Sequence, residues 1–171
     1  MNEGTGDIAR YFNERADKWD ESGCSGESRV QDAVLSLVDL KPGDTVLDLG
    51  CGTGVMIPCY LSAKAGRIVA VDVSEKMIER AREKFGTEPS VELRACDALS
   101  LDEAERFDAV IIYNAYPHFP NKPALVEKVY RLLKPKGRFA VAHGIGRDAI
   151  NRHHEVVAAG VSCGLRAASE E

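Results

Sequence analysis

Three glycines at alternate positions, Gly50, Gly52 and Gly54, follow an apolar run at residues 45–49. Glycine lets the backbone turn sharply and approach a ligand closely, because it has no side chain. We expect a helix to begin near Thr53, so that its free N–H groups point at the same place. The loop therefore predicts a nucleotide-type site. Its G-x-G-x-G spacing differs from the G-x-G-x-x-G of dinucleotide-binding enzymes, because a valine follows the third glycine.

Two aspartates follow later apolar runs that have the character of strands. Asp72 lies 20 residues after Gly52 and could accept hydrogen bonds from both hydroxyls of a ribose. The alternative is that it only supports the start of the helix that Ser74 caps. Asp97 follows the next run and could accept a hydrogen bond from an adenine amino group, or be a solvated turn residue. Together the two carboxylates favour a nucleoside ligand beside the glycine loop.

These residues need a scaffold that brings several strand ends to one edge. The apolar runs predict strands over residues 45–49, 67–71, 91–95, 107–114 and 138–142. Amphipathic segments between them predict helices, with one before the first strand at residues 29–40 and a last one over about 147–159. This alternation predicts a doubly wound, Rossmann-like, mostly parallel α/β sheet in three layers, α/β/α. Ligands bind beyond the carboxyl ends of such strands, and the motifs fall there.

The ordered motifs VLDLGCGTG, VAVDVS, ACDA, FDAVIIYN and LLKPKGRFAVAH resemble those of class I S-adenosylmethionine (SAM) dependent methyltransferases. The resemblance covers about residues 8–150. It implies SAM as the cofactor and S-adenosylhomocysteine (SAH) as its product. It also implies that the methionine end of SAM is held by Asp48 and by the loop at residues 50–54, Cys51 included. A nicotinamide-dependent oxidoreductase is disfavoured by the glycine spacing and by the later motifs.

By the same resemblance, the nucleoside end of SAM is held by residues after the second, third and fourth strands. Asp72 would hold the ribose. The residues that would surround the adenine or complete the pocket are Val73, Met77, Asp97, Ala98 and Asn114.

The N-terminal segment ARYFNERADKWDE is similar to the lid of small-molecule members of this family, in which an aromatic side chain closes over the cofactor. Tyr11 and Trp19 are the expected lid residues, and the alternative is a helix that only packs on the sheet. We therefore expect an N-terminal helical lid at residues 1–28 and a SAM-binding methyltransferase domain at 29–160. A C-terminal tail at 161–171 would follow, and the chain would be either a truncated product or a minimal member of the family.

The reactive end is harder to assign. Methyl transfer from a sulfonium is an in-line displacement, so the protein mainly aligns the acceptor and excludes water. A general base is needed only where the acceptor is protonated at working pH. His118, after the fourth strand, is a candidate base or a residue that shapes the SAM pocket. His143 ends the fifth strand, and Arg147, Asn151 and His154 would share one helix face, which either contacts the acceptor or is solvated.

Composition limits the classes of function. The chain has 171 residues, a formal net charge of −5 and no basic stripe, so no nucleic-acid partner is expected. We also expect no membrane span and no secretion signal. Five cysteines without C-x-x-C spacing favour a reducing, cytoplasmic compartment over disulfides or zinc. Adjacent His153 and His154 would point about 100° apart on a helix, so no metal site is predicted.

The sheet of this family usually has two further strands after the fifth, which the segment VSCGLRAASEE does not supply. We expect the edge of the fifth strand to be covered by the C-terminal segment or by a second copy in a homodimer, because an open edge invites aggregation. The leading hypothesis is a SAM-dependent methyltransferase acting on an O, N or S atom of a small-molecule acceptor. The alternative is a non-catalytic SAM- or SAH-binding protein or partner subunit.

Overall fold

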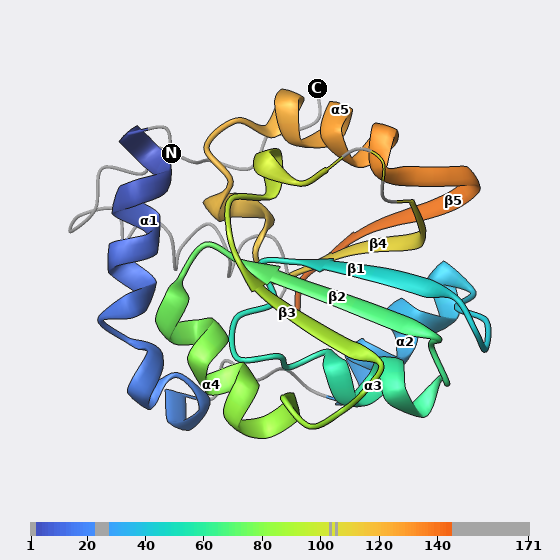
Figure 1. Cartoon of the computed structure of the whole chain (residues 1–171), viewed down its shortest axis with the longest axis horizontal. Coiled ribbons are helices and arrows are strands. Elements are labelled where there is room, and N and C mark those ends of the chain that lie inside the picture. Colours follow the sequence, from blue (N-terminus) through green and yellow to red (C-terminus); the bar gives the residue numbers. More distant parts are fainter. Residues whose placement is uncertain (1–2, 23–27, 103, 105, 145–171) are drawn as a thin grey trace.

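A five-stranded parallel sheet forms the centre of the computed structural model, which describes residues 3–22, 28–102, 104 and 106–144 (Figure 1). The strand order is β3-β2-β1-β4-β5, and each neighbouring pair is parallel. The strands are β1 (Thr45–Leu49), β2 (Arg67–Asp72), β3 (Val91–Ala95), β4 (Phe107–Tyr113) and β5 (Leu133–Ala142). The helices are α1 (Glu3–Asn13), α2 (Ser28–Val38), α3 (Ile57–Ser62), α4 (Glu75–Phe85) and α5 (Lys122–Leu132). The doubly wound α/β fold predicted from the sequence is confirmed.

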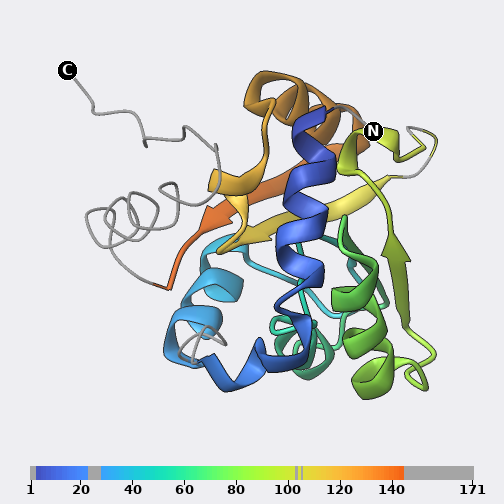
Figure 2. The same cartoon turned by 90° about the vertical axis from the view of Figure 1, so that its left-hand side faces the viewer.

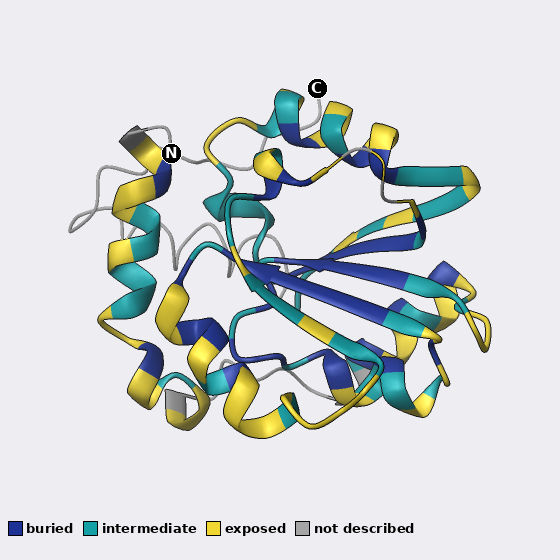
Figure 3. Cartoon of the chain, viewed as in Figure 1, coloured by how far each residue is buried: buried dark blue, intermediate teal, exposed yellow. Residues whose placement is uncertain are grey.

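Helices cover both faces of the sheet (Figure 1), and the central strands are mostly buried (Figure 3). Buried apolar side chains form the core between the layers. One core layer lies against α2, α3 and α4 and includes Val46 and Ile68. The other lies beneath α5 and includes Leu47 and Val69. Successive residues of β1 and β2 thus point to opposite layers, as strand geometry requires. Because both faces are covered, these central strands are mainly apolar and do not alternate with polar residues; the exceptions within them include the buried Asp48 of β1 and the terminal residues of β2.

Helix α1 runs across the carboxyl edge of the sheet, from the side of α5 to the side of α4 (Figure 2). Two short 3-10 turns continue its path, at Ala16–Lys18 and Asp20–Ser22. This segment was expected to be a separate lid over residues 1–28, and that division of the chain stays a prediction.

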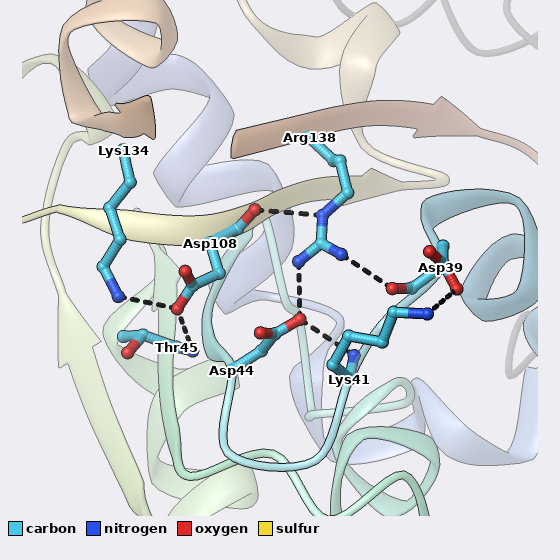
Figure 4. Close-up of polar contacts among 7 residues, drawn as sticks. All are labelled: Asp39, Lys41, Asp44, Thr45, Asp108, Lys134 and Arg138. Carbon is cyan, nitrogen blue, oxygen red and sulfur yellow. Dashed lines mark hydrogen bonds and ion pairs between the residues drawn. The ribbon is translucent and has the colours of Figure 1, made fainter. Parts of the chain in front are cut away.

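A polar network ties the amino ends of β1, β4 and β5 together (Figure 4). The Asp108 carboxylate accepts hydrogen bonds from Thr45 N at 2.8 Å and from Lys134 Nζ at 2.7 Å. Arg138 pairs with Asp44 and donates to the carbonyl oxygen of Asp108 at 3.3 Å. Partial burial raises the pKa of Asp108, but the bonds from Lys134 and Thr45 outweigh it and hold that pKa below its usual value. The network lies at the opposite end of the strands from the glycine loop, so we interpret it as structural.

The helix after the glycine loop begins later than predicted. It starts at Ile57 and not near Thr53. Gly54 has a φ of +87°, which a right-handed helix cannot include, so the helix can begin only after Gly54. The loop itself, and not a helix end, therefore presents the backbone N–H groups at this site.

The two edges of the sheet differ in character. On β3, Glu92 pairs with Arg94 and Arg67, and such a charged edge discourages pairing with another strand. On β5, which is longer than predicted, Phe139 and Val141 are 37% and 40% exposed. The helix predicted over residues 147–159 and the tail lie outside the described residues. What covers the β5 edge therefore stays a prediction.

Three further expectations concern membranes, thiols and metals. No helix in the described part of the chain is long and apolar enough to cross a membrane. Cys51, Cys59 and Cys96 are free thiols, whereas Cys24 and Cys163 lie outside the described residues. Within those same ranges, no group of three or more His, Cys, Asp or Glu side chains is arranged to hold a metal ion.

Candidate functional site

The glycine loop at residues 50–54 leaves the carboxyl end of β1 through three glycines with positive φ. The values are +73° for Gly50, +55° for Gly52 and +87° for Gly54. A Cβ on Gly50 would lie 2.4 Å from the Cβ of Ala115, and one on Gly54 would lie 2.8 Å from the ring of Phe85. Both glycines are therefore required by conformation, as predicted for a sharp turn, and also by the side chains packed against them, which the sequence did not predict.

Asp72, at the end of β2, holds this loop in place. Its Oδ2 accepts a hydrogen bond from Gly52 N at 2.9 Å, and its Oδ1 accepts one from Ser74 N at 2.8 Å. Burial raises the pKa of Asp72, and the bonds from these N–H groups offset part of the rise. Each carboxylate oxygen has a second lone pair. Asp72 can therefore hold the loop and still accept hydrogen bonds from ribose hydroxyls.

Asp48 is a buried carboxylate beneath the loop, 1% exposed, and its Oδ2 has no hydrogen-bond partner among the described residues. Burial, and then the negative charge of Asp72, raise its pKa to about 7. The buried hydroxyl of Tyr60 lies close enough to offset part of this rise. Burial likewise raises the pKa of the Cys51 thiol well above its usual value, which disfavours the reactive thiolate form. An unsatisfied carboxylate at this place fits a cationic ligand group.

Residues expected beside the adenine gather at the ends of β2 and β3. Met77 and Ala98 are buried, and Val73 is half-buried. Asp97 begins the short 3-10 turn after β3, with one carboxylate oxygen accepting from the backbone of that turn. Its other oxygen accepts a hydrogen bond from Thr5 of α1 at 3.5 Å. The structure thus brings the predicted cofactor residues to one edge, under α1.

Residues 4–20, which we call the strap, contact the loops at this edge one after another. At one end, a Cβ on Gly4 would touch Pro120 in the loop after β4, at 3.5 Å. At the other end of α1, Asn13 Oδ1 accepts hydrogen bonds from Ser74 Oγ at 2.7 Å and from Lys76 N at 3.2 Å. The strap therefore covers the carboxyl ends of the strands, which is the position expected of a lid.

An aromatic cluster joins the strap to the loop after β4. The ring of Phe12 packs edge-to-face on Trp19 at 5.3 Å and on His118 at 5.0 Å between centroids. The indole Nε1 of Trp19 lies 3.9 Å from where a Cβ on Gly52 would be, so the indole sits over the glycine loop. Trp19 is placed as a lid residue should be. His118 faces the strap, and the ring of Phe12 lies between His118 and Trp19 and contacts both.

Phe12 was missed by the sequence reasoning, which named Tyr11. The ring of Tyr11 packs against Phe12 at 5.2 Å and carries the guanidinium of Arg15 at 3.6 Å from its centroid. The sequence did carry a signal for Phe12. It lies seven positions after Thr5, and residues seven positions apart lie on the same face of a helix. Thr5 contacts Asp97 and Phe12 contacts His118, so this face is the one turned to the site.

The remaining candidates lie near the ends of β4 and β5. Asn114, with a φ of +56°, accepts a hydrogen bond at its Oδ1 from Gly144 N at 2.7 Å. This bond ties the loop after β4 to the segment after β5. His143 is half-buried beside this connection. Arg147 and His154 lie outside the described residues, so their predicted stripe stays a prediction.

A comparison with known protein families matches a family model to the part of the chain that contains the glycine loop. The model of a family described as a methyltransferase domain matches residues 46–137, more than half of the chain. The chain belongs to this methyltransferase family. The class I SAM-dependent methyltransferase inferred from the sequence is thereby confirmed, and SAM is the methyl donor of this family.

Among curated relatives, an uncharacterised methyltransferase of Schizosaccharomyces pombe is 37% identical over 131 residues, which are 69% of this chain and 46% of that protein. The 27-O-demethylrifamycin SV methyltransferase of Amycolatopsis mediterranei is 28% identical over 130 residues, 72% of this chain and 48% of its own. A solved structure of phospholethanolamine N-methyltransferase 2 of Haemonchus contortus, in complex with phosphomonomethylethanolamine and SAH, has a TM-score of 0.60 at 28% identity. It is matched over 65% of this chain and 27% of that one.

The match to the methyltransferase family contains the glycine loop and the three aspartates at the strand ends, Asp48, Asp72 and Asp97. It begins at residue 46 and therefore leaves out the strap. The chain spans about half the length of the curated relatives it matches. The residues of this methyltransferase domain nevertheless fit SAM on their own evidence. The glycine loop turns sharply through three positive φ angles, Asp72 has lone pairs beyond those that hold the loop, and Asp48 Oδ2 is a buried carboxylate oxygen without a hydrogen-bond partner among the described residues.

Proposed function

We propose that this methyltransferase domain transfers the methyl group of SAM to an O, N or S atom of a small-molecule acceptor. The observation that carries the proposal is the arrangement of Asp48, Asp72 and Asp97 at the ends of three adjacent strands around the glycine loop. A nucleoside with a cationic amino-acid tail matches that pattern of acceptors. The strap above the loop supports a reaction that has to exclude water.

The roles follow from position. Asp72 holds the ribose hydroxyls, Asp97 meets the adenine edge, and Asp48 faces the ammonium group of the methionine end. When bound, SAM supplies an activated methyl group on a sulfonium, so the acceptor forms its new bond as the carbon–sulfur bond breaks. The protein contributes alignment, and a general base matters only for an acceptor that must lose a proton.

His118 is our candidate for the acceptor side of the pocket. It follows β4 and packs edge-to-face on Phe12 at 5.0 Å, and Phe12 in turn packs on Trp19. These rings offer an apolar wall to an organic acceptor and help to keep water out. An acceptor of small size is also supported by relatives such as the rifamycin methyltransferase, whose name gives an organic small molecule.

A two-step experiment tests the proposal. Isothermal calorimetry first measures the binding of SAH and of NADH, and we expect SAH alone to bind. Methyl-labelled SAM is then incubated with a panel of phenols, amines and thiols, and transfer of label to one class is expected. NADH binding without SAH binding would overturn the cofactor assignment.

A second candidate is a SAM- or SAH-binding protein without catalysis. The observation that favours it is that the glycine loop, Asp48 and Asp72 fit the cofactor and not the acceptor, so they would serve a protein that only binds SAM or SAH equally well. Tight SAH binding with no label transfer to any acceptor would favour this candidate. Label transfer at any rate above the SAM-alone control would exclude it.

A further inference from the structure

One carboxylate of the strap reaches the cofactor loop itself. Asp20 Oδ1 accepts a hydrogen bond from Thr53 Oγ at 2.6 Å. Its Oδ2 pairs with Lys84 Nζ of α4 at 2.9 Å. Partial burial raises the pKa of Asp20, but the bonds from Thr53 and Lys84 outweigh it and lower that pKa, so the carboxylate is ionised at neutral pH. Asp20 therefore joins the strap, the glycine loop and α4 at one point.

Thr53 is the residue through which this contact bears on the loop. It lies between Gly52 and Gly54 and is 2% exposed. It carries the single side-chain hydroxyl of residues 50–54. On its other side the loop is held by backbone bonds to β2 and by the bond from Gly52 N to Asp72. Asp20 thus fixes the half of the loop that β2 does not reach.

A second carboxylate of the strap provides a natural comparison. Asp17 Oδ1 pairs with Arg80 of α4 at 2.6 Å, and both side chains are well exposed. This pair ties the same strap to the same helix but has no contact with the glycine loop. Any effect that belongs to strap-to-helix attraction in general should be shared by Asp17 and Asp20.

We propose that Asp20 is a positioning residue that couples closure of the strap to the conformation of the glycine loop. The inference rests on the proposed function, because the loop has to hold SAM or SAH. With Asp20 in place, Thr53 is held down and Trp19, the neighbouring residue, stays over Gly52. Without it, the loop loses its side-chain anchor and the indole is free to lift from the cofactor.

The test compares Asp20→Ala, Thr53→Val, their double variant, and Asp17→Ala as the matched control. SAH affinity is measured by calorimetry and SAH release by stopped flow. Strap position is read from acrylamide quenching of Trp19, the single tryptophan of the chain. We expect Asp20→Ala to weaken SAH binding about tenfold, the worth of a charge-assisted hydrogen bond. Release should accelerate to match, and Trp19 in the SAH complex should become more accessible to acrylamide.

The double variant decides whether Asp20 acts through Thr53, because the two losses should then not add. Asp17→Ala should keep SAH affinity within twofold, and all variants should melt within a few degrees of the wild type. Equal losses in Asp17→Ala and Asp20→Ala, or no loss in Asp20→Ala, would overturn the inference while leaving the proposed function intact. A wild-type protein that does not bind SAH would overturn both.

Discussion

Gly52 N donates a hydrogen bond to Asp72 Oδ2 at 2.9 Å, and this bond joins the glycine loop to the residue expected to hold the ribose. The two residues end up in contact because β1 and β2 are parallel neighbours whose carboxyl ends lie side by side. The loop and the ribose acceptor are therefore one unit. Replacing the Asp72 carboxylate should therefore weaken binding of both the ribose and the methionine end of the cofactor.

Asp72→Ala should weaken SAH binding on the order of 100-fold, because it removes the charged acceptor and frees the loop at once. Calorimetry with SAH measures this directly. Glu127→Ala is the control, since Glu127 is an exposed carboxylate of α5 that pairs with Arg131. Comparable affinity of Asp72→Ala and the control would contradict the assigned role.

Gly50→Ala should destabilise the fold by about 3 kcal/mol, because it adds a left-handed strain to a Cβ contact of 2.4 Å with Ala115. Gly43→Ala is the comparison, since Gly43 has a φ of +89° and open space around it. It should cost only the strain, about 1 kcal/mol. Urea unfolding measures both, and adding Ala115→Gly to Gly50→Ala should recover part of the loss. No recovery would mean that the contact with Ala115 is not the cause.

The strands, the glycine loop and Asp72 could be predicted because their signals are local. An apolar run such as residues 107–114 has to be a covered strand, and a glycine at alternate positions after a strand marks a turn. The start of α3 was predicted too early because sequence spacing does not reveal that Gly54 takes a positive φ. Boundaries depend on backbone angles that several residue types can adopt.

The strap contacts could not be predicted, because they join residues far apart in the chain. Asp20 and Thr53 are 33 residues apart, and Asn13 and Ser74 are 61. Their contact depends on the path of α1 over the sheet edge, and nothing in the local pattern fixes that path. The aromatic character of the lid was visible, but the choice of Phe12 over Tyr11 for the contact with His118 needed the orientation of the helix.

Asp48 should make the cofactor-free protein less stable as the pH rises from about 4 to about 7. Its pKa is raised to about 7 in the fold from a usual value of 3.8, because of burial and of the charge of Asp72. In that window the unfolded chain has lost the proton and the folded chain has kept it, so rising pH favours unfolding. The full effect is on the order of 4 kcal/mol and is complete above the folded pKa.

Asp48→Asn removes this titration, because an amide is neutral in both states. Urea unfolding at pH 4 and pH 8 should show a smaller fall in stability for the variant than for the wild type. The Asp72 carboxyl, whose pKa is also raised, stays in both proteins and leaves a common residual slope. Identical pH profiles of the free energy of unfolding would contradict the assignment.

The edge of β5 gives the last prediction. Val141 is 40% exposed on a strand that lies at the end of the described sheet, and an apolar edge of this kind needs a cover. Val141→Lys should break the cover. If a second copy provides it, light scattering should show a dimer in the wild type and a monomer in the variant. If the chain's own C-terminal segment provides it, the mass should stay the same and the stability should fall by about 1–2 kcal/mol.

Leu37→Lys on α2, where Leu37 is 87% exposed, is the control and should change neither quantity. A monomeric wild type whose stability is untouched by Val141→Lys would show that the edge is left open.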